Sequence, residues 1–132
     1  MRALGSDLVA DVTPLLPGLD ALVTDYSSLA FDASLVPLPL VYLAPDVDEY
    51  RVRRGFYGTY ADVAGETWST TWTDAARELD TVLSDPADRD RRIAASRDLD
   101  AHVHAFRDGQ STTRVYRAIL EGLARDSTKG PR

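Results

Sequence analysis

Two short runs of consecutive apolar residues stand out along the chain. The first covers residues 21–23, with Thr24 ending the predicted strand, and the second covers residues 40–43. Continuous apolar runs of this length are typical of strands that are buried on both faces of a parallel sheet. Between them, the spacing of apolar positions predicts a helix over 27–36, with Ser27 or Ser28 as its N-cap. Strand, helix and strand in this order predict a βαβ unit with a right-handed crossover.

The rest of the chain is patterned mainly for helices. We expect, in order, a short helix over 13–16, an irregular excursion over 46–57, a short strand over 67–71 and helices over 73–84, 87–97 and 111–125. The helix over 73–84 is expected to bury a face made of Ala76, Leu79, Val82 and Leu83. We expect residues 126–132 to form a disordered polar tail, which leaves residues 1–125 as one α/β domain.

Composition narrows the class of protein. The chain has 132 residues, of which 44% are hydrophobic and 27% are charged, as in a single globular domain. The net charge of −6 argues against nucleic acid as a partner. The absence of cysteine excludes disulfides and thiol catalysis. No apolar run approaches the roughly 20 residues of a spanning helix, and no signal peptide is evident, so we expect a soluble, cytoplasmic protein.

Several kinds of chemistry lack the residues that they need. The only lysine is Lys129, near the C-terminus, so the chain has no P-loop lysine. No G-x-S-x-G or G-x-G-x-x-G motif is present. His102 and His104 are two positions apart and therefore point in different directions in either a helix or a strand. We interpret them as surface histidines, and expect neither a metal nor a cofactor.

The strongest candidate site follows the first predicted strand. Asp25, Tyr26, Ser27 and Ser28 come directly after it, where ligands of open parallel sheets bind. Unpaired amides at a helix start and two hydroxyls favour a phosphate group. The same residues also have purely structural interpretations: N-capping for the serines, an Asx turn for Asp25 and packing for Tyr26.

A second group of candidates follows the second predicted strand. Asp46 is expected at the same sheet edge as Asp25, and Glu49 lies three residues later. These carboxylates either form a solvated turn or accept hydrogen bonds from ribose or glycerol hydroxyls. Arg53 and Arg54 are either surface arginines or partners for phosphate oxygens.

Four blocks of sequence, in their order and spacing, carry a resemblance to a known family. They are TDYSS at 24–28 with Phe31-Asp32, PLVY at 39–42, the group Asp46, Glu49 and Tyr50, and RGFY at 54–57. A weaker fifth block contains Asp108-Gly109, Ser111 and Arg114. Together they resemble the C-terminal part of the CDP-glycerol glycerophosphotransferase family, over most of residues 11–120. Members of this family build or prime teichoic-acid-type polymers.

The resemblance implies a fold and a function. The fold would be a partial Rossmann-like unit, the C-terminal part of the nucleotide-donor-binding domain of a GT-B enzyme. The full enzyme would move glycerol phosphate from CDP-glycerol, or a similar nucleotide-linked donor, to a membrane-linked polyol-phosphate acceptor at the inner face of the cell membrane, and release CMP. The implied phosphate-binding residues are Asp25, Tyr26, Ser27, Ser28 and Arg54, with Asp46 and Glu49 as hydroxyl-binding residues.

The catalytic histidines of the family lie upstream of the TDYSS block, beyond the start of this chain. The catalytic residues are therefore unknown. We expect the isolated chain to bind the donor weakly or not at all and to be inactive, with one sheet edge and one apolar face open. Two alternatives stay open. One is a non-catalytic fragment or interaction module that needs a partner chain, such as the missing N-terminal half. The other is a related transferase that uses another nucleotide-linked polyol or sugar.

Overall fold

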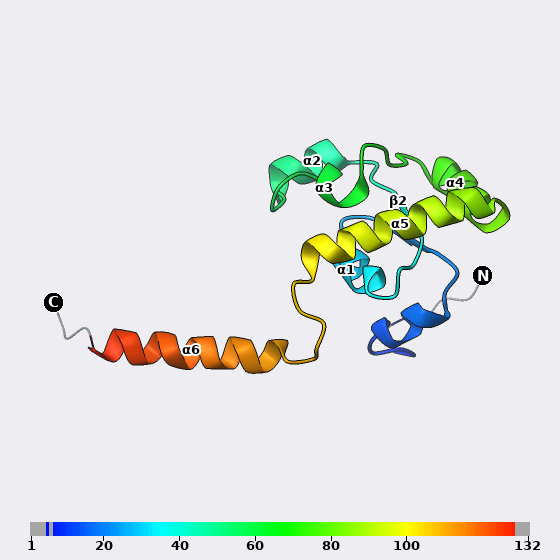
Figure 1. Ribbon diagram of the computed structural model, residues 1–132. Coiled ribbons are helices and arrows are strands. Elements are labelled where there is room, and N and C mark those ends of the chain that lie inside the picture. Colours follow the sequence, from blue (N-terminus) through cyan, green and yellow to red (C-terminus); the bar gives the residue numbers. More distant parts are fainter. Residues whose placement is uncertain (1–4, 6, 129–132) are drawn as a thin grey trace.

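Helices surround a pair of strands in an α/β body, and one further helix projects from this body (Figure 1). The computed structural model describes residue 5 and residues 7–128. The elements are, in order, η1 (Thr13–Gly18), β1 (Leu22–Thr24), α1 (Leu29–Ser34), β2 (Leu40–Tyr42), α2 (Val47–Arg53), α3 (Ala61–Ala64), α4 (Trp72–Ser84), α5 (Pro86–Val103) and α6 (Ser111–Thr128). The predicted succession of β1, α1 and β2 is confirmed.

The sheet is short and parallel. Leu22 pairs with Leu40, and Thr24 pairs with Tyr42. Beyond β2, the backbone of Ser69 forms a single parallel bridge with Leu43, because Ser69 donates to the Tyr42 carbonyl at 2.9 Å and accepts from the Ala44 amide at 2.8 Å. The strand predicted over 67–71 is therefore reduced to one bridging residue in this structure.

Helices cover both faces of the sheet, which confirms the α/β class. Leu40 and Tyr42 of β2 pack in one cluster with residues of α1 and α5. Val41, between them, points to the opposite face and packs against Ala75 and Val82 of α4. All of β2 is buried, as its continuous apolar sequence predicts for an interior strand.

The excursion predicted over 46–57 is wrong in one respect, because it contains the helix α2. Two acidic residues occupy the first turn of α2 and two arginines occupy its last turn, in agreement with the helix dipole. Ion pairs one turn apart join Arg51 to Asp48 and Arg53 to Glu49, both at 3.0 Å. Gly55, with φ of 76°, follows the helix in the left-handed conformation that commonly ends helices.

The predicted buried face of α4 is also wrong in part. Ala75 and Val82 are each 1% exposed, whereas Leu83 is 56% exposed. The helix starts earlier than predicted because Thr71 caps it, accepting from the Asp74 amide at 3.1 Å. The neighbouring helix α5 runs to Val103 rather than to 97, and so includes His102, which lies beyond the predicted end of this helix.

The last helix, α6, extends away from the α/β body (Figure 1). Val115 and Ile119, which the pattern places on its apolar face, are 60% and 54% exposed. The segment predicted to be disordered begins within α6, which continues to Thr128, and residues 129–132 lie outside the described residues. Among the described residues, no helix has the length and apolar character that crossing a membrane requires.

The weak fifth sequence block forms the junction between the body and α6. The Arg114 guanidinium donates to both carboxylate oxygens of Asp108, at 2.7 Å to Oδ1, and stacks 4.0 Å from the centre of the Phe106 ring. The Gln110 amide also donates to Asp108. The Arg114 guanidinium, with this amide, lowers the pKa of the Asp108 carboxyl to about 2.

This pair predicts a site-specific titration. Carbon-detected NMR should give a pKa of about 2 for Asp108, and the Arg114→Gln variant should move that pKa toward the value of about 3.9 for an unperturbed carboxyl. Because the folded-state pKa is lowered, any stabilisation from the pair is present above the unfolded pKa and is lost as the pH falls toward 2. An unchanged Asp108 titration in the variant would contradict this assignment.

Candidate functional site

The turn between β1 and α1 is held by its own polar side chains. The Ser27 amide donates to Asp25 Oδ1 at 3.1 Å, as an Asx turn requires. The Leu29 amide donates to Ser27 Oγ at 3.2 Å, whereas the Ser28 side chain makes no cap hydrogen bond. Of the two serines that the sequence offered as caps, Ser27 therefore bonds the start of α1. The exposed Ser28 hydroxyl is available to a ligand.

Tyr26 connects the ends of the two strands. Its hydroxyl donates to Asp46 Oδ1 at 2.8 Å, across 20 positions of sequence. The expectation that Asp46 lies at the same sheet edge as Asp25 is confirmed by this contact. Burial, together with the hydrogen bond to Asp46, raises the pKa of Tyr26 above its ordinary value. The phenol therefore remains protonated and a donor at physiological pH.

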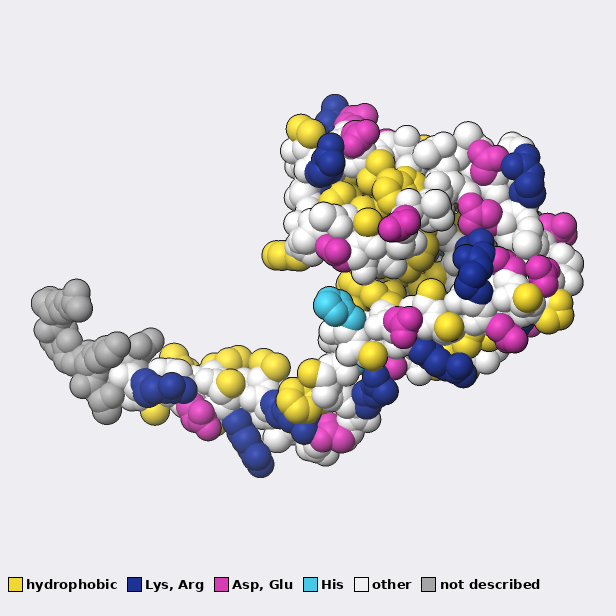
Figure 2. All heavy atoms as spheres, turned by 45° about the horizontal axis from the view of Figure 1, so that its top comes forward, with side chains coloured by type: hydrophobic (Ala, Val, Ile, Leu, Met, Phe, Trp, Pro, Cys, Tyr) yellow, Lys and Arg dark blue, Asp and Glu magenta, His cyan; other side chains and the backbone are white. Residues whose placement is uncertain are grey.

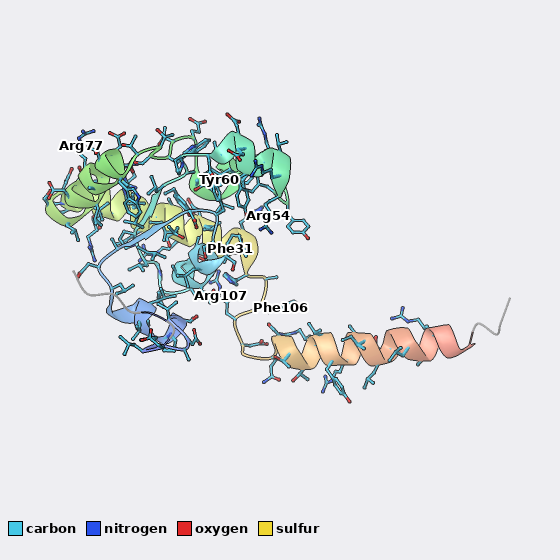
Figure 3. The ribbon with its side chains drawn as sticks, turned by 180° about the vertical axis from the view of Figure 1, so that it is seen from behind. Phe31, Arg54, Tyr60, Arg77, Phe106 and Arg107 are labelled. Carbon is cyan, nitrogen blue, oxygen red and sulfur yellow. The ribbon has the colours of Figure 1, made fainter. Side chains whose placement is uncertain are left out.

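Tyr60 fixes the same turn from the opposite side. It is 6% exposed, and its hydroxyl donates to the Asp25 carbonyl at 3.1 Å. Its ring meets the Tyr26 ring edge-on, with centroids 5.2 Å apart. Figure 3 shows Tyr60 beside α3, which it precedes in the chain. Tyr60 was not among the residues predicted from the sequence, although the density of aromatic residues over 56–60 is a signal that points to this segment.

An aromatic cluster surrounds these contacts. Its members are Tyr26, Tyr42, Tyr50, Phe56, Tyr60 and Trp68. The rings of Tyr26 and Tyr50 stack at 4.0 Å, and those of Phe56 and Tyr60 stack at 5.6 Å. The cluster joins α2 and the RGFY segment to the turn after β1. It gives Tyr26 a structural role in addition to any contact with a ligand.

The two predicted charged residues of the α2 region differ in their surroundings. Glu49 is paired with Arg53 at 3.0 Å on the exposed side of α2. Arg54 is exposed, and within the described part of the chain its guanidinium makes no ion pair or hydrogen bond. In the view of Figure 3, Arg54 projects from the end of α2 toward α1. Arg54 therefore keeps all its donors for a ligand, whereas Glu49 would have to leave Arg53.

The arrangement provides groups for a phosphorylated and hydroxylated ligand. Hydroxyls, carboxylates and one unpaired guanidinium follow the carboxyl ends of adjacent parallel strands. Among the described residues, no group of histidine and acidic side chains is arranged to hold a metal ion. His104 Nδ1 lies 3.1 Å from Asp100 Oδ1, and His102 lines a separate cavity. The two histidines are therefore not part of this turn.

Comparisons with known proteins give one consistent family. Residues 6–121 match the family model described as CDP-Glycerol:Poly(glycerophosphate) glycerophosphotransferase. A teichoic acid glycerol-phosphate transferase of Staphylococcus aureus is 30% identical over 115 residues, which is 84% of this chain and 28% of that protein. A teichoic acid poly(glycerol phosphate) polymerase of Staphylococcus epidermidis is 42% identical over 71 residues, which is 52% of this chain and 10% of that protein.

A third relative acts on a different polyol, by its name. The teichoic acid poly(ribitol-phosphate) polymerase of Bacillus spizizenii is 40% identical over 52 residues, covering 39% of this chain and 8% of that protein. The chain thus spans less than a third of the length of each of these relatives. No solved structure gives a significant match.

Proposed function

Because this chain belongs to the CDP-glycerol:poly(glycerophosphate) glycerophosphotransferase family, we propose that it is the donor-binding portion of such an enzyme. In this proposal the whole enzyme transfers glycerol phosphate from CDP-glycerol to a teichoic-acid-type acceptor at the inner face of the membrane and releases CMP. The chain corresponds to the C-terminal part of a GT-B fold. The catalytic base, which removes the proton of the attacking hydroxyl, comes from outside this chain.

The observation that carries the proposal is the construction of the turn over 25–28. Tyr26 ties it to Asp46 at 2.8 Å, and Tyr60 ties it to the Asp25 carbonyl at 3.1 Å. A turn held in this way presents the Ser28 hydroxyl in a fixed geometry, which reduces the ordering cost of binding. Arg54 supplies a planar cation with its donors unused, which suits the diphosphate of the donor.

The residues have separate roles in this proposal. Ser27, Ser28 and Arg54 stabilise the charge on the diphosphate while the acceptor hydroxyl attacks the phosphorus that carries the glycerol. Asp25 and Tyr26 orient the turn, and Asp46 accepts a sugar or glycerol hydroxyl with the oxygen that Tyr26 leaves unused. Glu49 is a second acceptor once it has left Arg53. Together these contacts position the donor rather than perform the chemistry.

A second candidate has specific support. Two relatives are named for ribitol phosphate, a polymerase and a primase from Bacillus spizizenii, with 40% and 39% identity over short segments. In this second candidate function, the donor that this chain binds is a CDP-linked polyol other than glycerol, such as ribitol. The diphosphate contacts would be shared, and only the contacts with the polyol would differ.

Calorimetric titration of the purified chain tests the donor site. We expect weak but saturable binding of CDP-glycerol, stronger than that of CMP or UMP, because the diphosphate provides the charged oxygens that Ser28 and Arg54 contact. The double variant Ser27→Ala with Ser28→Ala should weaken CDP-glycerol binding at least about tenfold, since each hydrogen bond to a charged group is worth about 1.5–3 kcal/mol. CDP-ribitol in the same series distinguishes the two polyol donors.

The matched control is Ser84→Ala, which removes a hydroxyl at the end of α4 that bonds the Asp80 carbonyl. This variant should bind CDP-glycerol as the unaltered chain does. Equal affinities for the double variant and the control would contradict the donor site over 25–28. Release of CMP by the chain alone would contradict the placing of the catalytic base outside it.

A further inference from the structure

A cavity of about 430 Å³ lies between β2, α3 and α5. Leu40 and Tyr42 of β2 and Leu99 of α5 contribute apolar surface to it. Figure 2 shows a hollow with an apolar floor where α5 meets the α2–α3 part of the body. Its volume is within the range of small-molecule sites, which is about 300–1,000 Å³.

Two hydroxyls in the wall of this cavity have no hydrogen-bond partner among the described residues, and the one of Ser96 is fully buried. Ser96 is 2% exposed, and its Oγ makes no hydrogen bond. Tyr42 is 8% exposed, and its hydroxyl makes no hydrogen bond with a described residue, so that burial alone raises its pKa to about 12. Most buried polar groups are hydrogen-bonded, and each exception needs an explanation. The buried, unpaired hydroxyl of Ser96, with the unbonded hydroxyl of Tyr42 in the same cavity wall, indicates a ligand that supplies the missing partners.

The charges around the cavity select the class of ligand. Arg92 is bonded to Glu78 at 3.0 Å and to the Leu40 carbonyl at 2.9 Å, and Arg91 is bonded to Asp88. Both arginines are therefore neutralised within the protein. Asp62 and Asp98 also line the cavity, and neither forms an ion pair with a described arginine. In the described lining neither arginine is left unpaired, and the two carboxylates disfavour phosphates and ligand carboxylates.

We propose that this cavity binds an uncharged, polyhydroxylated small molecule of the sugar or polyol class. Each hydroxyl of such a ligand both donates and accepts, which matches the hydroxyls of Ser96 and Tyr42. Its donors also suit the carboxylates of Asp62 and Asp98, and its C–H surface suits Leu40 and Leu99. This site does not share residues with the turn over 25–28, and it does not rest on the proposed function.

The test is a titration of the isotopically labelled chain with glycerol, ribitol and glucose, monitored by amide chemical shifts. We expect saturable shift changes, confined to residues that line the cavity, with at least one of the three probes, and a rise in Tm with the same probe. The double variant Ser96→Ala with Tyr42→Phe should weaken that binding at least fivefold. Glycerol 3-phosphate should bind more weakly than glycerol, because the carboxylates of Asp62 and Asp98 repel its phosphate group.

Two further variants show whether this cavity is a binding site or only a gap in the packing. Ala95→Phe places a ring in the cavity from the surface of α5. It should abolish the shift changes, while the amide spectrum of the variant remains that of a folded protein. Ser84→Ala removes a hydroxyl outside the cavity, and should leave the binding unchanged. The proposal is overturned if none of the three probes gives saturable shifts, if Ala95→Phe retains them, or if glycerol 3-phosphate binds as tightly as glycerol.

Discussion

Replacing Tyr60 by Ala should lower the free energy of unfolding by about 4 kcal/mol, the typical cost of removing a buried aromatic side chain. Tyr60 is 6% exposed and lies at the centre of the aromatic cluster, in ring contact with Tyr26, Tyr42, Phe56 and Trp68. The substitution also removes the hydrogen bond to the Asp25 carbonyl. Urea unfolding, followed by tryptophan fluorescence, measures the loss.

Two other substitutions divide this effect into its parts. Tyr60→Phe keeps the ring and removes only the hydroxyl, so we expect a loss of about 1 kcal/mol. Tyr57→Ala makes the same change as Tyr60→Ala at a tyrosine whose side chain is fully exposed, and should change stability by less than about 0.5 kcal/mol. Equal losses at positions 57 and 60 would contradict the central role of Tyr60.

Local pattern was sufficient to predict the elements that lie close together in sequence. The runs over 21–23 and 40–43 became β1 and β2, because both are short, apolar and bounded by polar or proline residues. The position of Asp46 beside the end of β1 also follows from the sequence, because carboxyl ends of parallel strands share a sheet edge. For the N-cap of α1 the sequence left two candidates, Ser27 and Ser28, because a serine at either position can cap the start of the helix.

Contacts over long distances in sequence could not be predicted in this way. Tyr60 reaches the Asp25 carbonyl across 35 positions, and no periodic pattern records such a contact. The helix α2 was missed because it has no buried residue, so its apolar periodicity is weak and its ion pairs support it instead. The buried face of α4 was misplaced because a packed neighbour, rather than the local apolar pattern, decides which residues are covered.

Arg92 connects three elements of the body, and replacing it should cost nearly as much stability as replacing Tyr60. Its guanidinium donates to the Leu40 carbonyl of β2 at 2.9 Å, to Glu78 of α4 at 3.0 Å and to Asp88 of α5 at 2.9 Å. Glu78 in turn accepts from the Ser69 hydroxyl at 2.6 Å. The Asp88 side chain is only 10% exposed. Removing Arg92 therefore leaves a largely buried carboxylate without its main partner.

We expect Arg92→Ala to lower the free energy of unfolding at pH 7 by about 3 kcal/mol, the lower end of the cost of breaking a buried ion pair. Burial tends to raise the pKa of Asp88, but the hydrogen bonds from Arg92 and Arg91 outweigh it, so this pKa is lowered in the folded protein. A lowered pKa stabilises the fold above the unfolded value of about 3.9, and that contribution is lost as the pH falls further. The difference between the variant and the unaltered chain should therefore shrink below about pH 4.

Adjacent substitutions give this prediction its controls. Arg91→Ala removes an arginine that also pairs with Asp88 but whose side chain is 69% exposed, so we expect a loss below about 1 kcal/mol. Arg92→Lys keeps the charge but replaces the planar guanidinium with an ammonium group, which cannot reach all three acceptors at once. We therefore expect a loss of stability between those of the two alanine variants. Urea unfolding at pH 7 and at pH 3.5 measures all three variants. If Arg92→Ala and Arg91→Ala lose equal stability at pH 7, the network through Glu78 and Leu40 contributes nothing, and Arg92 acts only as a surface partner of Asp88.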